Sequence, residues 1–123
     1  MRHLGAELEA MRPGECEIAV RWREELGQQH GYFHAGVTGA IADSACGYAA
    51  FSLMPPGSMV LTVEYKLNLL APAAGERLVA RGRVVRAGRT LTVCTAEVVA
   101  VKGEEEKTVA ASLSTIMRLE ERE

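Results

Sequence analysis

One long helical pattern, residues 34–54, constrains the fold of this chain more than any other feature. Its apolar residues recur every three or four positions, as they do along one side of an α-helix. The members of this mostly apolar stripe are Val37, Ala40, Ile41, Ser44, Tyr48 and Phe51. Pro55, Pro56 and Gly57 follow directly and predict that the helix ends there. The other elements therefore have to pack around one central helix.

A second row of this helix carries almost no side chains. It runs through Gly36, Gly39, Asp43 and Gly47. A glycine inside a helix costs roughly 1 kcal/mol relative to alanine, so these glycines indicate that another backbone or a ligand approaches closely. No Lys or Arg lies three or four positions from Asp43, so this carboxylate lacks a partner on its own helix. Two interpretations stay open: Asp43 takes part in chemistry, or it is a solvated Asp on a surface helix.

Alternating apolar and polar residues predict β-strands in most of the remaining chain. The predicted strands cover residues 15–23, 59–69, 76–87, 89–102 and 106–119. A tight hairpin is expected at Ala87-Gly88-Arg89.

The segments outside these patterns are shorter. In residues 2–11, Leu4, Leu8 and Met11 lie on one side of a predicted short amphipathic helix, which Pro13-Gly14 would end. Residues 24–33 are expected to be irregular, and the last four residues, EERE, to form a frayed charged tail.

The order of these elements predicts an α+β fold, in which an antiparallel sheet covers one face of the long helix. The stripe through Val37, Ile41, Tyr48 and Phe51 would point toward that sheet. A chain of 123 residues has the size of one domain, so residues 1–123 are expected to form a single domain.

Composition argues against several classes of function. The formal net charge is -2 and aromatic residues make up 5% of the chain, so no nucleic-acid partner is expected. Cys16, Cys46 and Cys94 are odd in number and far apart, which predicts buried thiols and neither a disulfide framework nor a zinc site. The first residues carry charges throughout and no long apolar run, so a cytoplasmic protein without a membrane partner is expected.

Several motifs around the long helix, taken in their order and spacing, resemble the PaaI-type acyl-CoA thioesterases of the hot-dog fold. That family places His-Gly-Gly at the start of a central helix, Asp in its middle, Asn six residues before the His, and Gly-Lys/Arg-Thr in a hairpin. The corresponding residues here are His34-Ala35-Gly36, Asp43, Gln28 and Gly88-Arg89-Thr90. The resemblance covers residues 28–118 and implies a long central helix wrapped by an antiparallel sheet of five to six strands.

The resemblance also implies hydrolysis of acyl-CoA thioesters to a free acid and CoA. Asp43 would act as general base or as nucleophile. The backbone N–H groups of Ala35 and Gly36, at the helix start, would form an oxyanion hole, although every helix start has free N–H groups. His34 would position the thioester carbonyl or simply cap the helix. Gln28 replaces the family's Asn with a longer side chain that still carries an amide donor.

The remaining family positions lie on strands and on a hairpin. Thr62 matches a hydroxyl that orients water in the family, although strand alternation places it on the face opposite the helix, together with Glu64. Arg89 at the hairpin tip, and more weakly Arg86 and Lys66, would meet the phosphates of coenzyme A, with surface solubility as the alternative. Coenzyme A is part of the substrate here, and neither a metal nor a redox cofactor is expected.

Distance along the helix predicts that the active site is shared. Seven residues of straight helix span about 10 Å, so Asp43 is far from its own helix start. Hot-dog proteins pair two helices across a dimer, and the row of glycines would allow a close approach. We therefore expect a homodimer or a dimer of dimers (a homotetramer), in which Asp43 of one chain faces the helix start of the other.

Two other functions fit a hot-dog fold. One is a dehydratase of 3-hydroxyacyl thioesters, which usually needs a His near its carboxylate, and Asp43 has none on its helix. The other is an acyl-CoA sensor without turnover, which would have no need of the carboxylate at Asp43. The sequence does not distinguish aromatic from aliphatic acyl groups.

Overall fold

The computed structural model describes residues 1–120, and residues 121–123 of the predicted charged tail lie outside the described residues. Two short 3-10 turns, one helix and six strands follow in chain order: η1 (Arg2–Leu4), β1 (Glu7–Arg12), β2 (Glu15–Arg21), η2 (Glu24–Leu26), α1 (Ala35–Phe51), β3 (Ser58–Leu69), β4 (Arg77–Ala87), β5 (Leu91–Lys102) and β6 (Glu105–Glu120).

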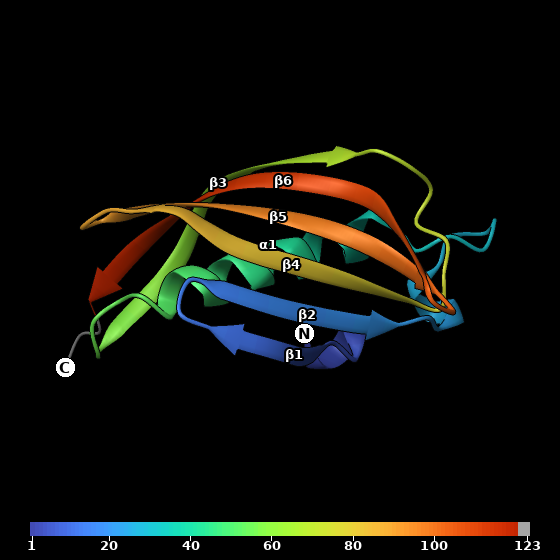
Figure 1. Ribbon diagram of the computed structural model, residues 1–123, viewed down its shortest axis with the longest axis horizontal. Coiled ribbons are helices and arrows are strands. Elements are labelled where there is room, and N and C mark those ends of the chain that lie inside the picture. Colours follow the sequence, from blue (N-terminus) through green and yellow to red (C-terminus); the bar gives the residue numbers. More distant parts are fainter. Residues whose placement is uncertain (121–123) are drawn as a thin grey trace.

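The strands form one antiparallel sheet in the order β1-β2-β4-β5-β6-β3. This curved sheet passes along one side of α1, which lies behind it in Figure 1. The fold is therefore the α+β hot-dog arrangement that the sequence predicts. All five predicted strands are present, as β2 to β6, and β1 is an additional strand.

The predicted helix over residues 2–11 is wrong. Only Arg2–Leu4 make a helical turn, and the following Glu7–Arg12 pair as an edge strand with β2. Pro13-Gly14 is the turn of that hairpin, with Gly14 at φ 79°. Leu8 and Met11 remain exposed, so no apolar face exists that would have stabilised a helix here. Backbone pairing along the open edge of β2 decides the conformation instead.

The face of α1 that meets the sheet agrees with the prediction at Val37 and Ile41, which are buried, and differs from it at Tyr48 and Phe51. Tyr48 and Phe51 are 49% and 45% exposed, whereas the buried face is made of smaller residues. Its members include Thr38, Ile41, Ala42, Ala45, Cys46 and Ala49. Gly82 of β4 explains this choice, because a Cβ there would lie 2.7 Å from the carbonyl carbon of Ala45. Helix and sheet approach too closely for aromatic side chains to fit between them.

Helix α1 is also shorter than predicted, since it ends at Phe51 rather than Met54. The glycine row is not uniformly open either. A Cβ on Gly39 would lie 3.3 Å from Leu67 and 3.4 Å from the Tyr65 hydroxyl, both on β3 of the same chain. A Cβ on Gly47 would meet no atom within 4 Å. The prediction that the whole row is free for a second helix is therefore wrong at Gly39.

The three cysteines are buried free thiols, as predicted. Burial raises the pKa of the Cys16 thiol to about 11, which keeps it protonated at neutral pH. Within residues 1–120, no group of three or more His, Cys, Asp or Glu side chains is arranged to hold a metal ion. The same residues contain no helix of the length and apolarity needed to cross a membrane.

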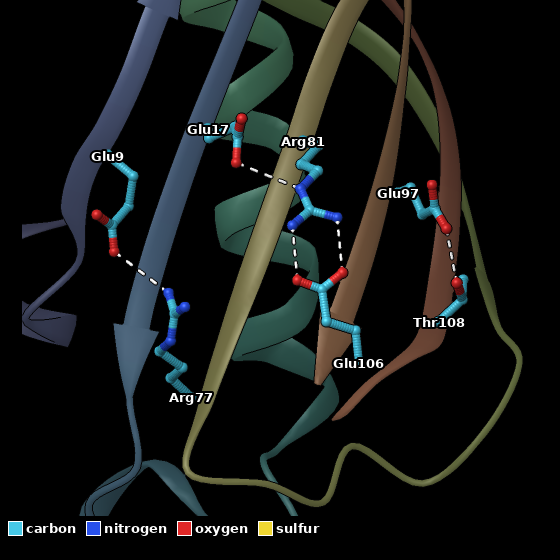
Figure 2. Close-up of polar contacts among 7 residues, drawn as sticks. All are labelled: Glu9, Glu17, Arg77, Arg81, Glu97, Glu106 and Thr108. Atoms are coloured by element: carbon cyan, nitrogen blue, oxygen red, sulfur yellow. Dashed lines mark hydrogen bonds and ion pairs between the residues drawn. The ribbon is translucent and has the colours of Figure 1, made fainter. Parts of the chain in front are cut away.

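The sheet face turned away from α1 carries a charged network (Figure 2). Arg81 donates two hydrogen bonds to Glu106, at 3.1 and 2.9 Å, and a third to Glu17 at 3.3 Å. The hydrogen bond and charge of Arg81 hold the pKa of Glu106 below its usual value. The charges of this network are therefore paired with one another on the outer face of the sheet.

Candidate active site

The start of α1 is capped by the side chain of His34. Its Nδ1 accepts the N–H of Gly36 at 3.0 Å, and its own backbone N–H donates to the carbonyl of Leu26 at 2.9 Å. The Gly36 N–H therefore already has an acceptor inside the chain. Within residues 1–120 the Ala35 N–H makes no hydrogen bond. Of the two amides predicted for an oxyanion hole, Ala35 is the one that is available.

The cap also fixes how His34 presents its ring. Because Nδ1 accepts a hydrogen bond, the neutral imidazole carries its proton on Nε2. The exposed ring therefore offers an N–H donor beside the helix start. Capping and positioning a carbonyl, the two roles predicted for His34, are compatible because they use different nitrogens.

Gln28 lies in the same hollow as His34 and Ala35. This cavity has a volume of about 740 Å³, and its apolar walls come from residues before the helix and from the end of β3, among them Tyr32, Phe33, Leu69 and Leu70. The Gln28 side-chain oxygen accepts the N–H of His30 at 2.6 Å. That bond orients the amide so that its NH₂ group is left as the donor.

Asp43, in the middle of α1, is half-buried and is bonded to Thr62 of β3. The Thr62 hydroxyl donates to Asp43 Oδ1 at 2.7 Å, which fixes one carboxylate oxygen, whereas Oδ2 accepts no hydrogen bond within residues 1–120. Within residues 1–120 no Lys, Arg or His forms an ion pair with Asp43. The two residues share a second cavity, of about 470 Å³, formed by α1 and β3 alone.

A β-bulge brings Thr62 to this position. In the pairing of β3 with β6, Thr62 lies opposite Ile116 and Glu64 opposite Thr115, so Val63 is an extra residue. Ile116 is fully buried against the helix side, so Thr62 faces α1, whereas Glu64 faces away. Simple alternation put both on one face, and the bulge is the reason why that expectation is wrong.

The predicted coenzyme A residues lie apart from one another. Arg89 borders a small hollow of about 200 Å³ at the tip of the β4–β5 hairpin. Lys66 pairs with Leu113 and so points to the outer face of the sheet, away from α1. Arg86 is exposed near the end of β4, directly after a second bulge. The structure therefore does not gather the three cations into one group.

Two residues that border these cavities were not identified from the sequence. Arg118 of β6 borders the hollow of Arg89, and its Nε donates to the Ser58 hydroxyl at 2.7 Å. Thr38 lines the cavity of Gln28, and its buried hydroxyl has no hydrogen-bond partner within residues 1–120. Neither stands in a recognisable motif, because each reaches its place through packing between distant segments.

Comparison with known proteins assigns the chain to a family. Residues 30–107 match the model of the Thioesterase superfamily, so the chain belongs to that superfamily. The chain that carries the Asp43–Thr62 pair is thus a member of a superfamily of thioesterases.

Individual relatives agree with this assignment. A Halobacterium salinarum protein, whose name places it provisionally among the esterases, is 33% identical over 101 residues, which is 78% of this chain and 66% of that protein. The 1,4-dihydroxy-2-naphthoyl-CoA hydrolase of Listeria monocytogenes is 25% identical over 113 residues, covering 92% of this chain and 89% of that enzyme.

Solved structures match over nearly the whole chain. A thioesterase family protein from Silicibacter pomeroyi superimposes with a TM-score of 0.95 at 48% identity, covering 98% of this chain and 88% of that one. The PaaI protein of the E. coli phenylacetic acid degradation operon gives a TM-score of 0.85 at 24% identity, covering 96% of this chain and 82% of that one. The latter likeness shows the shared fold alone.

Proposed function

We propose that this protein hydrolyses acyl-CoA thioesters to a free acid and CoA, with Asp43 as the group that activates the attack. The carrying observation is the Asp43–Thr62 pair: a carboxylate with one oxygen held at 2.7 Å, the other open, and a cavity beside it. A carboxylate fixed in this way can take a proton from water without reorienting. The name of the Listeria enzyme, a hydrolase of a CoA thioester, supports the choice of substrate class.

In this mechanism a water molecule attacks the carbonyl carbon of the thioester while Asp43 takes one of its protons. The carbonyl oxygen becomes an oxyanion, which the Ala35 N–H, at the positive end of the helix dipole, stabilises. The Nε2–H of His34 and the amide of Gln28 are the further donors in that cavity. The carbon–sulfur bond then breaks, and the CoA thiolate receives the proton from Asp43. Direct attack by the Asp43 carboxylate is the variant of this scheme that the geometry also allows.

The two halves of this site belong to two chains in our proposal. Ala35 and Asp43 are eight residues apart on α1, about 12 Å, and they line different cavities. Reacting groups have to come within about 3–3.5 Å of each other, so one chain cannot bring both to one carbonyl. Asp43 of one subunit would act together with Ala35 of the partner subunit.

The edge of the sheet supports such a dimer. Strand β3 lies at one of the two edges of the sheet, and its apolar residues Met59, Leu61, Tyr65 and Leu69 are 48–57% exposed. Long, apolar edge strands that stay unpaired are a risk for aggregation, and pairing with a second copy removes that edge. A β3–β3 contact would also bring the cavities beside β3 of both subunits close to the dimer axis. A dimer of such dimers is the larger assembly that we propose alongside it.

The direct test is hydrolysis by wild type and Asp43→Asn against a panel of short, long and aromatic acyl-CoA esters. Asp43→Asn keeps the shape and removes the base, so kcat should fall by about 100-fold or more while substrate binding persists. Glu64→Gln is the matched control, because Glu64 lies on the same strand as Thr62 but on the outer face. The kcat of this variant should stay at the wild-type value.

A near wild-type rate for Asp43→Asn would contradict the mechanism. Tight binding of acyl-CoA by the wild type without turnover would instead assign the chain to the acyl-CoA sensors. Hydration or dehydration of an enoyl or 3-hydroxyacyl ester in place of hydrolysis would assign it to the dehydratases.

A further inference from the structure

The cavity beside Asp43 has an apolar interior. Two aromatic residues of α1, Tyr48 and Phe51, and two residues of β3, Met59 and Val60, border it. All four are between 37% and 50% exposed, although residues of these types are usually buried. Apolar surface left open beside a carboxylate fits the apolar part of a ligand whose reactive group lies at that carboxylate.

Gly47 forms part of the same wall, one helical turn after Asp43. It lies inside α1, where glycine lowers helix stability relative to alanine, and its φ is not positive. The backbone conformation therefore does not require a glycine at this position.

Packing does not require a glycine at position 47 either. A Cβ on Gly82 would lie 2.7 Å from the backbone of Ala45, and one on Gly39 would lie 3.3 Å from Leu67. A Cβ on Gly36 would lie 3.2 Å from the capping nitrogen of His34. Gly47 alone among the glycines of α1 would place its Cβ in open space. Because residues four apart share one helix face, that space is the cavity beside Asp43.

We propose that Gly47 determines acyl-group specificity: its missing side chain keeps the cavity deep enough for a bulky apolar acyl group, such as an aromatic ring. This inference rests on the proposed thioesterase function and adds the class of acyl group to it. The cavity of about 470 Å³ is within the size range of pockets that enclose small organic ligands. With the ring against Tyr48 and Phe51, the attached carbonyl would lie at Asp43.

The test is a size series at this position, Gly47→Ala and Gly47→Leu, measured as kcat/KM on acetyl-CoA and benzoyl-CoA. The matched control is Ala40→Leu, which also places a leucine on α1 but in a different hollow, beside His3 and Leu4. Wild type should prefer benzoyl-CoA. Gly47→Leu should lower kcat/KM for benzoyl-CoA at least about tenfold and leave the acetyl-CoA value within about twofold, because one or more extra methylenes in a pocket discriminate by that order.

Gly47→Ala should lie between wild type and Gly47→Leu, and Ala40→Leu should keep the wild-type preference. The circular dichroism spectrum and the light-scattering mass of each variant should equal those of the wild type. If Gly47→Leu folds poorly, the smaller Gly47→Ala variant still reports the ratio of the two substrates.

Equal loss on both esters would overturn the inference, because it would show that the pantetheine arm shared by all CoA esters occupies the cavity. Dissociation of the oligomer in Gly47→Leu would overturn it as well, since a partner helix would then be what Gly47 admits. Hydrolysis with an unchanged acyl preference contradicts this inference alone. Absence of hydrolysis by wild type on every ester contradicts the proposed function and this inference with it.

Discussion

Ala35 and Gly36 are adjacent at the start of α1, yet their N–H groups have different surroundings. The imidazole of His34 occupies the Gly36 amide, and the Ala35 amide has no acceptor within residues 1–120. A charge that develops on a substrate oxygen would therefore be met by one main-chain donor rather than by two. In the proposed mechanism the side-chain donors of His34 and Gln28, which line the same cavity, would replace the second amide.

This difference makes Ala35→Pro an informative substitution. Proline removes the N–H, yet the first helical position tolerates it, and the preceding His34 has φ -65° and ψ 141°, which suits a residue before proline. We expect kcat to fall by about 100-fold with the fold intact, the usual cost of losing one oxyanion donor. Ala35→Ser, which keeps the N–H, is the control and should retain most activity. Wild-type turnover in a folded Ala35→Pro variant would exclude the Ala35 amide from the mechanism.

For single residues, the sequence identified the candidates but did not predict their hydrogen-bond partners. The spacing of His34 and Asp43 is readable in the chain, because both lie on one regular helix. The Thr62 hydroxyl could not be assigned to the correct face, since a bulge at Val63 depends on how β3 pairs with β6, far away in the sequence. Arg118 was missed for the same reason: its neighbour Ser58 is 60 residues away.

Among the elements, α1 and the β4–β5 hairpin have different parts in the proposed function. Small residues along one face of α1 let it lie close to the sheet, which leaves Tyr48 and Phe51 on the side of the cavity. The hydrophobic period correctly predicted that Val37 and Ile41 are buried, but it also placed Tyr48 and Phe51 against the sheet, because it ignores how closely the backbones approach. The strand patterns of β2 to β6, by contrast, were readable, since alternation depends only on one buried face.

The hairpin carries the prediction for coenzyme A. Arg89→Ala should raise KM about tenfold and leave kcat close to the wild-type value, because a phosphate contact far from the carbonyl stabilises ground state and transition state equally. Arg12→Ala on the β1–β2 hairpin is the matched control, as Arg12 is also exposed but pairs with Glu15. The measurement is steady-state kinetics on a full acyl-CoA and on a truncated thioester without the nucleotide. A phosphate contact predicts that only the full acyl-CoA loses affinity. Equal loss on both substrates would rule out a phosphate contact.

On the scale of the whole molecule, the proposed mechanism divides the groups that it needs between two cavities of one chain. The helix-start cavity holds the donors and the mid-helix cavity holds the carboxylate, so each lacks what the other supplies. Strand β3 borders both cavities and is one of the two edge strands of the sheet. The sequence predicted this division from the length of the helix alone. It could not predict which surface pairs, because edge exposure follows from strand order, and strand order is not encoded in any local pattern.

Subunit mixing tests the shared site most directly. Homodimers of Asp43→Asn and of Ala35→Pro should each be nearly inactive, since every site lacks the base or the donor. After exchange of subunits, half of the dimers are mixed and each mixed dimer holds one intact site of two, so activity should return to about a quarter of the wild-type value. If both variants remain folded dimers, exchange subunits and regain no activity, each chain has to hold a complete site and the account is contradicted.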